Sequence, residues 1–104
     1  ELFSVIASLD GVFIESNYDP VMLSSGPYPA FLKKRIQGPK GHISNVESAE
    51  LLRSGTKLKW ACLAHLSEAN NNPDVALKTH HKIVGRRFSF YTASRYMSSG
   101  ILTV

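Results

Sequence analysis

The sequence predicts an α/β fold in which helices pack on at least one face of a sheet. Two apolar runs, residues 12–14 and a stretch within residues 57–66, have the length and composition of buried strands. Each run is followed by a polar loop and then by a helical pattern, an alternation typical of layered α/β domains. With 104 residues, of which 43% are apolar and 19% charged, the chain can form one small domain with its own core.

The first strand pattern follows the turn pair Asp10 and Gly11 and stops at polar residues. Residues 31–36 come next, between prolines, and their apolar side chains are spaced to form one face of a short helix. The basic residues of that segment then lie largely on its solvent side. The sequence therefore predicts a short amphipathic helix between the first strand and the next helical pattern.

Two longer helices have start and stop signals. The segment "NVESAELLRSG" has Asn45 as a plausible N-cap, glutamates in its early turns and Gly55 after its last turn. The segment "NNNPDVALKTHHKIVG" has Asn72 as its cap, Pro73 at the first helical position and Gly85 as its stop. We expect a helix in each segment, with the second apolar strand between them.

The last stretch alternates apolar and polar residues around Phe88, Phe90 and Thr92, which predicts a strand. A turn at "SSG" then leads into a final short strand, residues 101–104. No internal repeat or interdomain linker separates these elements.

Charge and cysteine content narrow the functional class only slightly. A net charge of +4 and a pI near 9.4 favour anionic partners, or serve solubility alone. The single cysteine, Cys62, lies in an apolar run and has no internal disulfide partner, which fits a core residue in a reducing, cytoplasmic protein. No stretch reaches the roughly 20 apolar residues of a membrane span, so no membrane association is expected.

Two histidines occupy polar turns beside apolar runs: His42 in "GHISN" and His65 in "LAHLSEANNNP". Loops at the carboxyl ends of strands in α/β sheets are where sites gather. From the residues alone, however, a histidine in a turn is more often a cap or a satisfied polar group than a ligand. His80 and His81 are adjacent on a predicted helix and point about 100° apart, so we interpret them as boundary residues and not as ligands of one ion.

Residues 10–84 resemble the carboxy-terminal half of metallo-β-lactamase-fold hydrolases, specifically a bacterial branch implicated in exonuclease activity on DNA. The resemblance depends on "GPYP", "GHISN" and "AHLSEANNNP", which occur in the family's order and spacing. It implies that residues 1–104 form half of an αββα sandwich, a mixed sheet with helices on one face. The same half is also similar to ribonuclease Z.

The resemblance implies roles for three residues. His65 would be a metal ligand, while His42 with Glu15 would handle the proton or the scissile phosphate. The implied cofactor is a pair of zinc ions, with manganese as an alternative, because such a pair can hold a hydroxide in line and neutralise charge on phosphate oxygens. A ligand histidine usually has an acceptor that fixes its ring, for which Ser67 and Glu68 are candidates.

The resemblance implies DNA as the substrate, and basic residues just upstream of His42 could hold a nucleic-acid backbone. A solvated helix face with a basic loop explains them equally well. Tyr28 and Phe31 fit either stacking on a terminal base or core packing. The residues expected to bind substrate are Lys33, Lys34, Arg35, Lys40, Ser44 and Asn45.

The family's His-X-His-X-Asp-His loop does not occur in this sequence. Because a catalytic zinc usually needs three protein ligands, we expect this chain to be an inactive fragment whose partner is the missing amino-terminal half. An uncovered sheet face would also permit self-association. The residues expected on that face are Val12, Ile14, Trp60 and Leu63. The alternative is a non-enzymatic basic module that binds nucleic acid or a partner chain.

Overall fold

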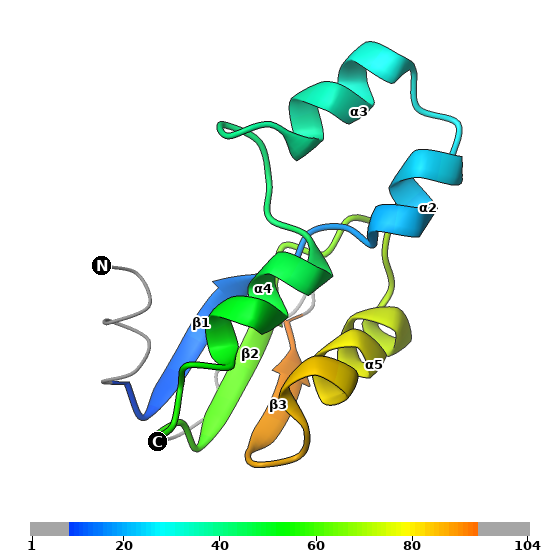
Figure 1. Cartoon of the computed structure of the whole chain (residues 1–104). Helices are drawn as coiled ribbons and strands as arrows, with labels where there is room; N and C mark the ends of the chain where they lie inside the picture. The colour runs from blue at the N-terminus through cyan, green and yellow to red at the C-terminus, as the bar shows by residue number, and fades with distance from the viewer. Residues whose placement is uncertain (1–8, 94–104) are drawn as a thin grey trace.

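Three parallel strands form the centre of the chain in the computed structural model, which describes residues 9–93 (Figure 1). The strands are β1 (Gly11–Glu15), β2 (Trp60–Ala64) and β3 (Ser89–Thr92), in the order β1-β2-β3. Both pairings are parallel, so the described sheet is parallel and not mixed as expected. The predicted strand at residues 101–104 lies outside the described residues.

The helices divide into a pair on the sheet and a pair beyond it. Figure 1 shows α4 (Asn45–Leu52) and α5 (Pro73–Val84) next to each other on one face of the sheet. The same view shows α2 (Pro20–Ser25) and α3 (Ala30–Gln37) beyond the carboxyl ends of the strands. The α/β class is confirmed, and within residues 9–93 no helix is both long and apolar enough to cross a bilayer.

The core lies between the sheet and the pair α4 and α5. Successive side chains of a strand point to opposite faces, so Val12 and Ile14 pack against the core while Phe13 points away and is 57% exposed. Leu63 is completely buried in the same core. The expected exposed patch is therefore wrong for Val12, Ile14 and Leu63, because their side chains pack in the core that α4 and α5 cover. The register instead places Phe13 beside Cys62, and Cys62 beside Tyr91, on the other face.

Helix α4 begins at a capping box. The Ser44 hydroxyl accepts the backbone N–H of Glu47 at 3.1 Å, and the Glu47 carboxylate accepts the backbone N–H of Ser44 at 2.8 Å. Ser44 is therefore the N-cap and the prediction of Asn45 was wrong by one residue. Both residue types are good caps, and only the backbone conformation decides between neighbours. Asn45 becomes the first helical residue and is completely buried.

Helix α5 starts and stops where predicted. The Asn72 side chain accepts the backbone N–H of Val75 at 2.9 Å, and Pro73 follows as the first helical residue. Gly85 ends the helix with φ 88°, a left-handed conformation that glycine adopts without a Cβ penalty. Both signals were therefore correct.

His80 is not a boundary residue, because its side chain is completely buried between α4 and α5. Its Nδ1 lies 2.8 Å from the Ala76 carbonyl oxygen and its Nε2 lies 3.1 Å from the Ser48 hydroxyl. The neutral ring with a proton on Nδ1 satisfies both contacts, donating to Ala76 and accepting from Ser48. Burial lowers the pKa of His80, partly offset by the Ala76 hydrogen bond and reinforced by His81.

Helix α2 was not predicted. Asp19 caps it by accepting the backbone N–H of Met22 at 3.0 Å, and Pro20 is its first residue. An aspartate before a proline is typical of a turn as well as of a helix N-cap, so the local pattern did not distinguish these two structures. In α3, the Lys33 ammonium donates to the Ser24 carbonyl at 2.9 Å, and this bond ties α3 to α2.

Candidate functional site

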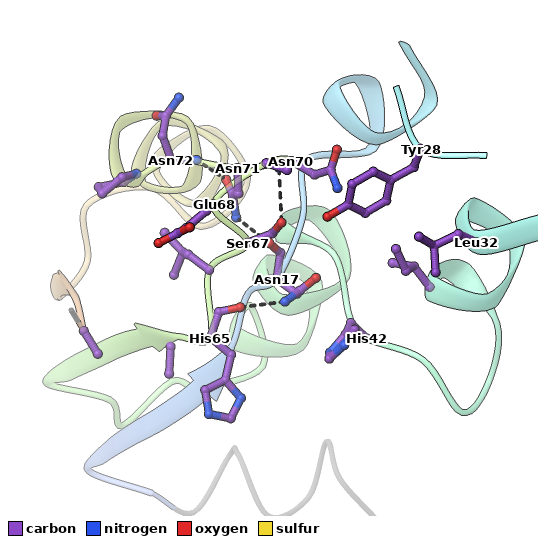
Figure 2. A pocket seen from close by; sticks show the side chains of 16 residues that line it. Asn17, Tyr28, Leu32, His42, His65, Ser67, Glu68, Asn70, Asn71 and Asn72 are labelled. Carbon is purple, nitrogen blue, oxygen red and sulfur yellow. Dashed lines mark hydrogen bonds between the residues drawn. The ribbon is translucent and has the colours of Figure 1, made fainter. Parts of the chain in front are cut away.

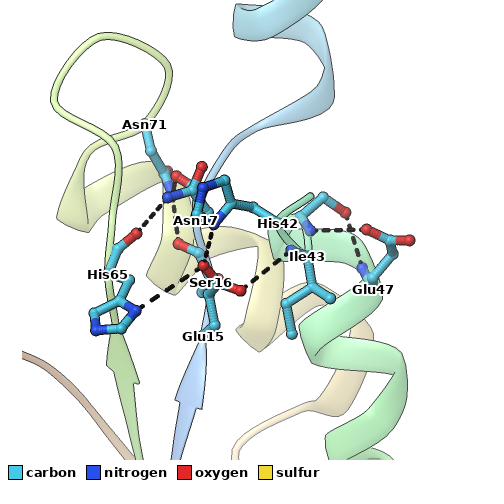
Figure 3. Close-up of polar contacts among 9 residues, drawn as sticks. Glu15, Ser16, Asn17, His42, Ile43, Glu47, His65 and Asn71 are labelled. Carbon is cyan, nitrogen blue, oxygen red and sulfur yellow. Dashed lines mark hydrogen bonds and ion pairs between the residues drawn. The ribbon is translucent and has the colours of Figure 1, made fainter. Parts of the chain in front are cut away.

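The structure brings Glu15, His42 and His65 together at the carboxyl edge of the sheet (Figure 3). Glu15 is the last residue of β1, His65 directly follows β2, and His42 lies in the turn before α4. The His42 Nδ1 atom lies 2.5 Å from Glu15 Oε2, and the His65 Nδ1 atom lies 4.0 Å from the same oxygen. We call these three residues the Glu15 cluster. One carboxylate thus lies between two imidazole rings.

The Glu15 cluster is open to solvent, and hydrogen bonds hold its carboxylate in place. The side chains of His65 and His42 are 78% and 49% exposed, whereas that of Glu15 is 25% exposed. The second oxygen of Glu15 accepts a long hydrogen bond, 3.4 Å, from the backbone N–H of Ile43. The carboxylate is therefore held from the side of the His42 turn. When the Nδ1 proton of His42 is donated to Glu15, the Nε2 atom remains for another partner.

His65 has a backbone conformation that is uncommon for a residue with a side chain, with φ 56°. Among the described residues other than glycine, it alone has a positive φ. Such a left-handed conformation costs about 1–3 kcal/mol and persists where the surroundings impose it. Asn17 contributes to this, since its side-chain amide donates to the His65 carbonyl at 2.7 Å.

A buried network of hydrogen bonds between side chains, which we call the amide network, joins the segments that carry the cluster. No local sequence pattern predicted it. The side chains of Asn45 and Asn71 hydrogen-bond to each other at 2.9 Å, and the Asn71 amide also donates to the Ser16 carbonyl at 2.9 Å. The Ser16 hydroxyl donates to the side-chain Oδ1 atom of Asn45. All three side chains are nearly or completely buried. The network therefore fixes the end of β1 against the start of α4 and the loop before α5.

The residues predicted to bind substrate have different positions in the structure. Ser44 and Asn45 are buried and use their side chains in the cap and in the amide network, so both have structural roles. Lys33 is engaged with Ser24. Lys34, Arg35 and Lys40 are exposed on α3 and on the loop that follows it.

The basic segment is connected directly to His42. The backbone N–H of His42 donates to the Ile36 carbonyl at 3.0 Å, so the turn packs on the last part of α3. The three exposed cations therefore lie on the segment that carries His42 into the site.

A cavity of about 1140 Å³ opens at this edge of the sheet (Figure 2). His42 and His65 both line it, which places the two predicted functional histidines on one cavity. In Figure 2, Tyr28 and Leu32 stand beside each other on one side of this cavity, and His65 lies on the other side. Tyr28 was not a predicted site residue, although its sequence context fitted base stacking as well as core packing.

The ring of His65 is accessible, but the described residues hold no complete metal site. Within residues 9–93, no three side chains of histidine, cysteine, aspartate or glutamate are grouped so as to hold a metal ion. The carboxylate that faces His65 Nδ1 is Glu15. Ser67, a predicted acceptor for that ring, instead accepts the backbone N–H of Asn70 at 3.1 Å.

One neighbouring phenol is unsuited to base chemistry. Burial raises the pKa of Tyr18, and the nearby Glu47 carboxylate acts in the same direction. The Tyr18 phenol is therefore protonated at neutral pH.

Comparison with known proteins identifies homologues. The chain is 40% identical over 77 residues to exodeoxyribonuclease WalJ of Streptococcus pneumoniae, from strains D39 and R6, covering 72% of this chain and 29% of the relative. It is 36% identical over 74 residues to exodeoxyribonuclease YycJ of Bacillus anthracis, covering 69% of this chain and 28% of the relative. The match thus spans about three tenths of the length of these curated relatives.

No family profile matches the chain. No solved structure matches it significantly. The chain is therefore homologous, over most of its length, to proteins named as exodeoxyribonucleases.

Proposed function

We propose that this chain is part of a metal-dependent hydrolase of the metallo-β-lactamase fold that cleaves phosphodiester bonds in DNA as an exonuclease. The observation that carries the proposal is the Glu15 cluster, a carboxylate between two imidazoles at the carboxyl edge of the sheet. The homologues named as exodeoxyribonucleases support the choice of DNA. In this proposal the chain supplies one side of the active site.

His42 has the geometry of a proton donor. Glu15 accepts the Nδ1 proton of His42 at 2.5 Å, which orients the ring. A proton on Nε2 can then be donated to the oxygen that leaves the phosphorus. Because His42 lines the cavity, a phosphate held there is within its reach.

His65 is the residue that would hold a metal ion. Its ring is 78% exposed, and its Nδ1 faces the Glu15 carboxylate, so Nε2 is left for coordination. We propose two zinc ions, with manganese as the alternative, and further ligands from polypeptide outside this chain. A bound pair of such ions would activate water and neutralise charge on the phosphate. By itself the chain would be inactive, since one histidine does not hold a catalytic zinc.

Exposed cations on α3 and its loop would hold the DNA backbone. Lys34, Arg35 and Lys40 lie on the segment that ends at His42, so phosphates bound by them would lead into the cavity. Contacts of this kind carry affinity without sequence preference and weaken with salt. Lys33 contributes less, because its ammonium group is engaged with Ser24.

The test uses the longer protein that contains this chain. We expect Glu15→Gln and His42→Ala each to lower exonuclease kcat by about 10²–10⁴-fold, the usual contribution of a general acid. Glu50→Gln is the matched control, because Glu50 is an exposed carboxylate on α4 whose partner is Arg53. His65→Ala should also lower the bound metal, measured by elemental analysis.

Two outcomes would contradict the proposal. Unchanged kcat in both Glu15→Gln and His42→Ala would remove the proton-transfer role, and unchanged metal content in His65→Ala would remove the ligand role. DNA binding that is salt-sensitive, with no cleavage in the longer protein, would favour the alternative of a non-enzymatic basic module.

A further inference from the structure

Two chemically different kinds of side chain line the cavity beside the Glu15 cluster. His42, His65 and Asn17 are polar. Tyr28, Leu32 and Ile36 are aromatic or apolar, and we call these three residues the Tyr28 wall. Ligand cavities of roughly 300–1,000 Å³ that combine apolar walls with a few polar groups are typical of small-molecule sites. A cavity of about 1140 Å³ therefore has room for a nucleotide unit.

The Tyr28 wall is not part of the hydrophobic core. Helix α3 contains no buried residue, and Tyr28, Leu32 and Ile36 are each only partly buried. The core lies elsewhere, between the sheet and α4 and α5. Three apolar side chains thus line a cavity in place of packing together with the core. This distinguishes Tyr28 from Phe31, which is 72% exposed and does not line the cavity.

Hydrogen bonds connect the end of α3 to His42 and the middle of α3 to α2. The His42 N–H donates to the carbonyl of Ile36, a member of the wall, at 3.0 Å. The Lys33 ammonium donates to the Ser24 carbonyl at 2.9 Å and so joins α3 to α2, on either side of Tyr28. The aromatic ring and the proposed proton donor therefore belong to one connected segment.

We infer that the Tyr28 wall binds the base of the nucleotide whose phosphate lies at His42. The inference rests on the proposed function and deepens it, since it assigns the substrate class recognised by this side of the cavity. A nucleobase is flat and aromatic, and it stacks on a tyrosine ring irrespective of its identity. Leu32 and Ile36 cover apolar surface beside the ring, while the exposed cations of α3 remain for phosphates. The subsite requires a base but does not select among bases.

The first test measures nucleotide binding to this chain. Isotope-labelled chain is titrated with dAMP and with deoxyribose 5-phosphate, which has the same sugar and phosphate but no base, and binding is followed by NMR shifts. We expect dAMP to bind more tightly and to shift the Tyr28 and Leu32 signals. Tyr28→Ala should weaken dAMP binding by about tenfold, in line with base stacking on aromatic rings. Tyr28→Phe keeps the ring and should preserve binding.

Phe31→Ala is the matched control, because it removes a nearby exposed aromatic ring that lies outside the cavity. It should leave dAMP binding unchanged. The inference is overturned if dAMP does not bind, if deoxyribose 5-phosphate binds as tightly, or if Tyr28→Ala binds dAMP as the unaltered chain does. Amide spectra of Tyr28→Ala and Tyr28→Phe show whether each variant remains folded.

The second test separates this inference from the proposed function. In the longer protein, cleavage of DNA with a normal terminal nucleotide is compared with cleavage of DNA whose terminal nucleotide is abasic. Tyr28→Ala should remove most of the preference for the normal terminus, whereas His42→Ala should abolish cleavage of both. Cleavage that needs His42 but ignores Tyr28 would overturn the subsite alone. Tyr28-dependent dAMP binding without any cleavage would support the subsite and contradict the proposed function.

Discussion

The side-chain amide of Asn17 donates a hydrogen bond to the backbone carbonyl of His65, with the two atoms 2.7 Å apart. Asn17 follows β1 and His65 follows β2, so the bond joins the ends of two neighbouring strands. It fixes the one described residue other than glycine that has a positive φ. A residue outside the Glu15 cluster therefore helps to position the exposed imidazole.

Asn17→Asp removes this donor while preserving the shape of the side chain. The His65 carbonyl then loses its partner, and we expect the free energy of unfolding to fall by about 1 kcal/mol. Urea denaturation of the chain measures this loss. The His65 ring signals should shift in NMR spectra while those of His81, on α5, stay in place. Unchanged His65 signals would show that Asn17 does not position the ring.

His65→Gly should stabilise the chain relative to His65→Ala by about 1 kcal/mol, because alanine is strained at φ 56° and glycine is not. The His65 side chain is 78% exposed, so its removal costs little packing. Thermal and urea unfolding of the two variants measure the difference. In the longer protein, both variants should lose metal to the same extent. Equal stability of the two variants would contradict the prediction of backbone strain.

His80 should make the stability of the chain depend on pH. Because burial lowers the pKa of His80 below its ordinary value of 6.5, the unfolded chain takes up a proton at a pH where the folded chain does not. The stabilisation is therefore complete above about pH 6.5 and is lost as the pH falls towards the lowered pKa. Urea midpoints at several pH values between about 7.5 and 5 measure the effect.

The control for this pH dependence is the adjacent histidine. His80→Gln should flatten the dependence, whereas His81→Gln should retain most of it, since His81 is only partly buried. A steep loss of stability below pH 6.5 that persists in His80→Gln would assign the effect to other groups.

The cations of α3 should determine the salt dependence of DNA binding. Replacing both Lys34 and Arg35 with alanine should weaken binding and lower the slope of log affinity against log salt by roughly 1–2, about one ion for each phosphate that is no longer neutralised. Replacing Lys78 and Lys82 on α5 removes the same charge from another exposed surface and is the control. Fluorescence anisotropy over a series of salt concentrations measures both slopes. If the two double variants lower the slope equally, then DNA binding depends on net charge alone and not on the position of the α3 cations.

The sequence by itself determined the order of the main elements and the place of the three predicted site residues along them. Strand alternation, the Asn72 cap and the Gly85 stop are local signals, because they depend on residues within one turn or one strand. Local patterns of the same kind placed His42 in a turn before a helix and His65 in a turn after a strand. Local patterns failed where two neighbouring residues are equally good N-caps, as Ser44 and Asn45 are at the start of α4.

Only the tertiary structure decided which of these residues meet. Glu15 and His42 are 27 positions apart, and Asn17 and His65 are 48 apart, so their contacts depend on how β1, β2 and the turn before α4 come together. Burial of His80 likewise required α4 to pack on α5. The physical reason is that a sequence pattern specifies which face a side chain takes within its own element, whereas a contact depends on the register and packing between elements.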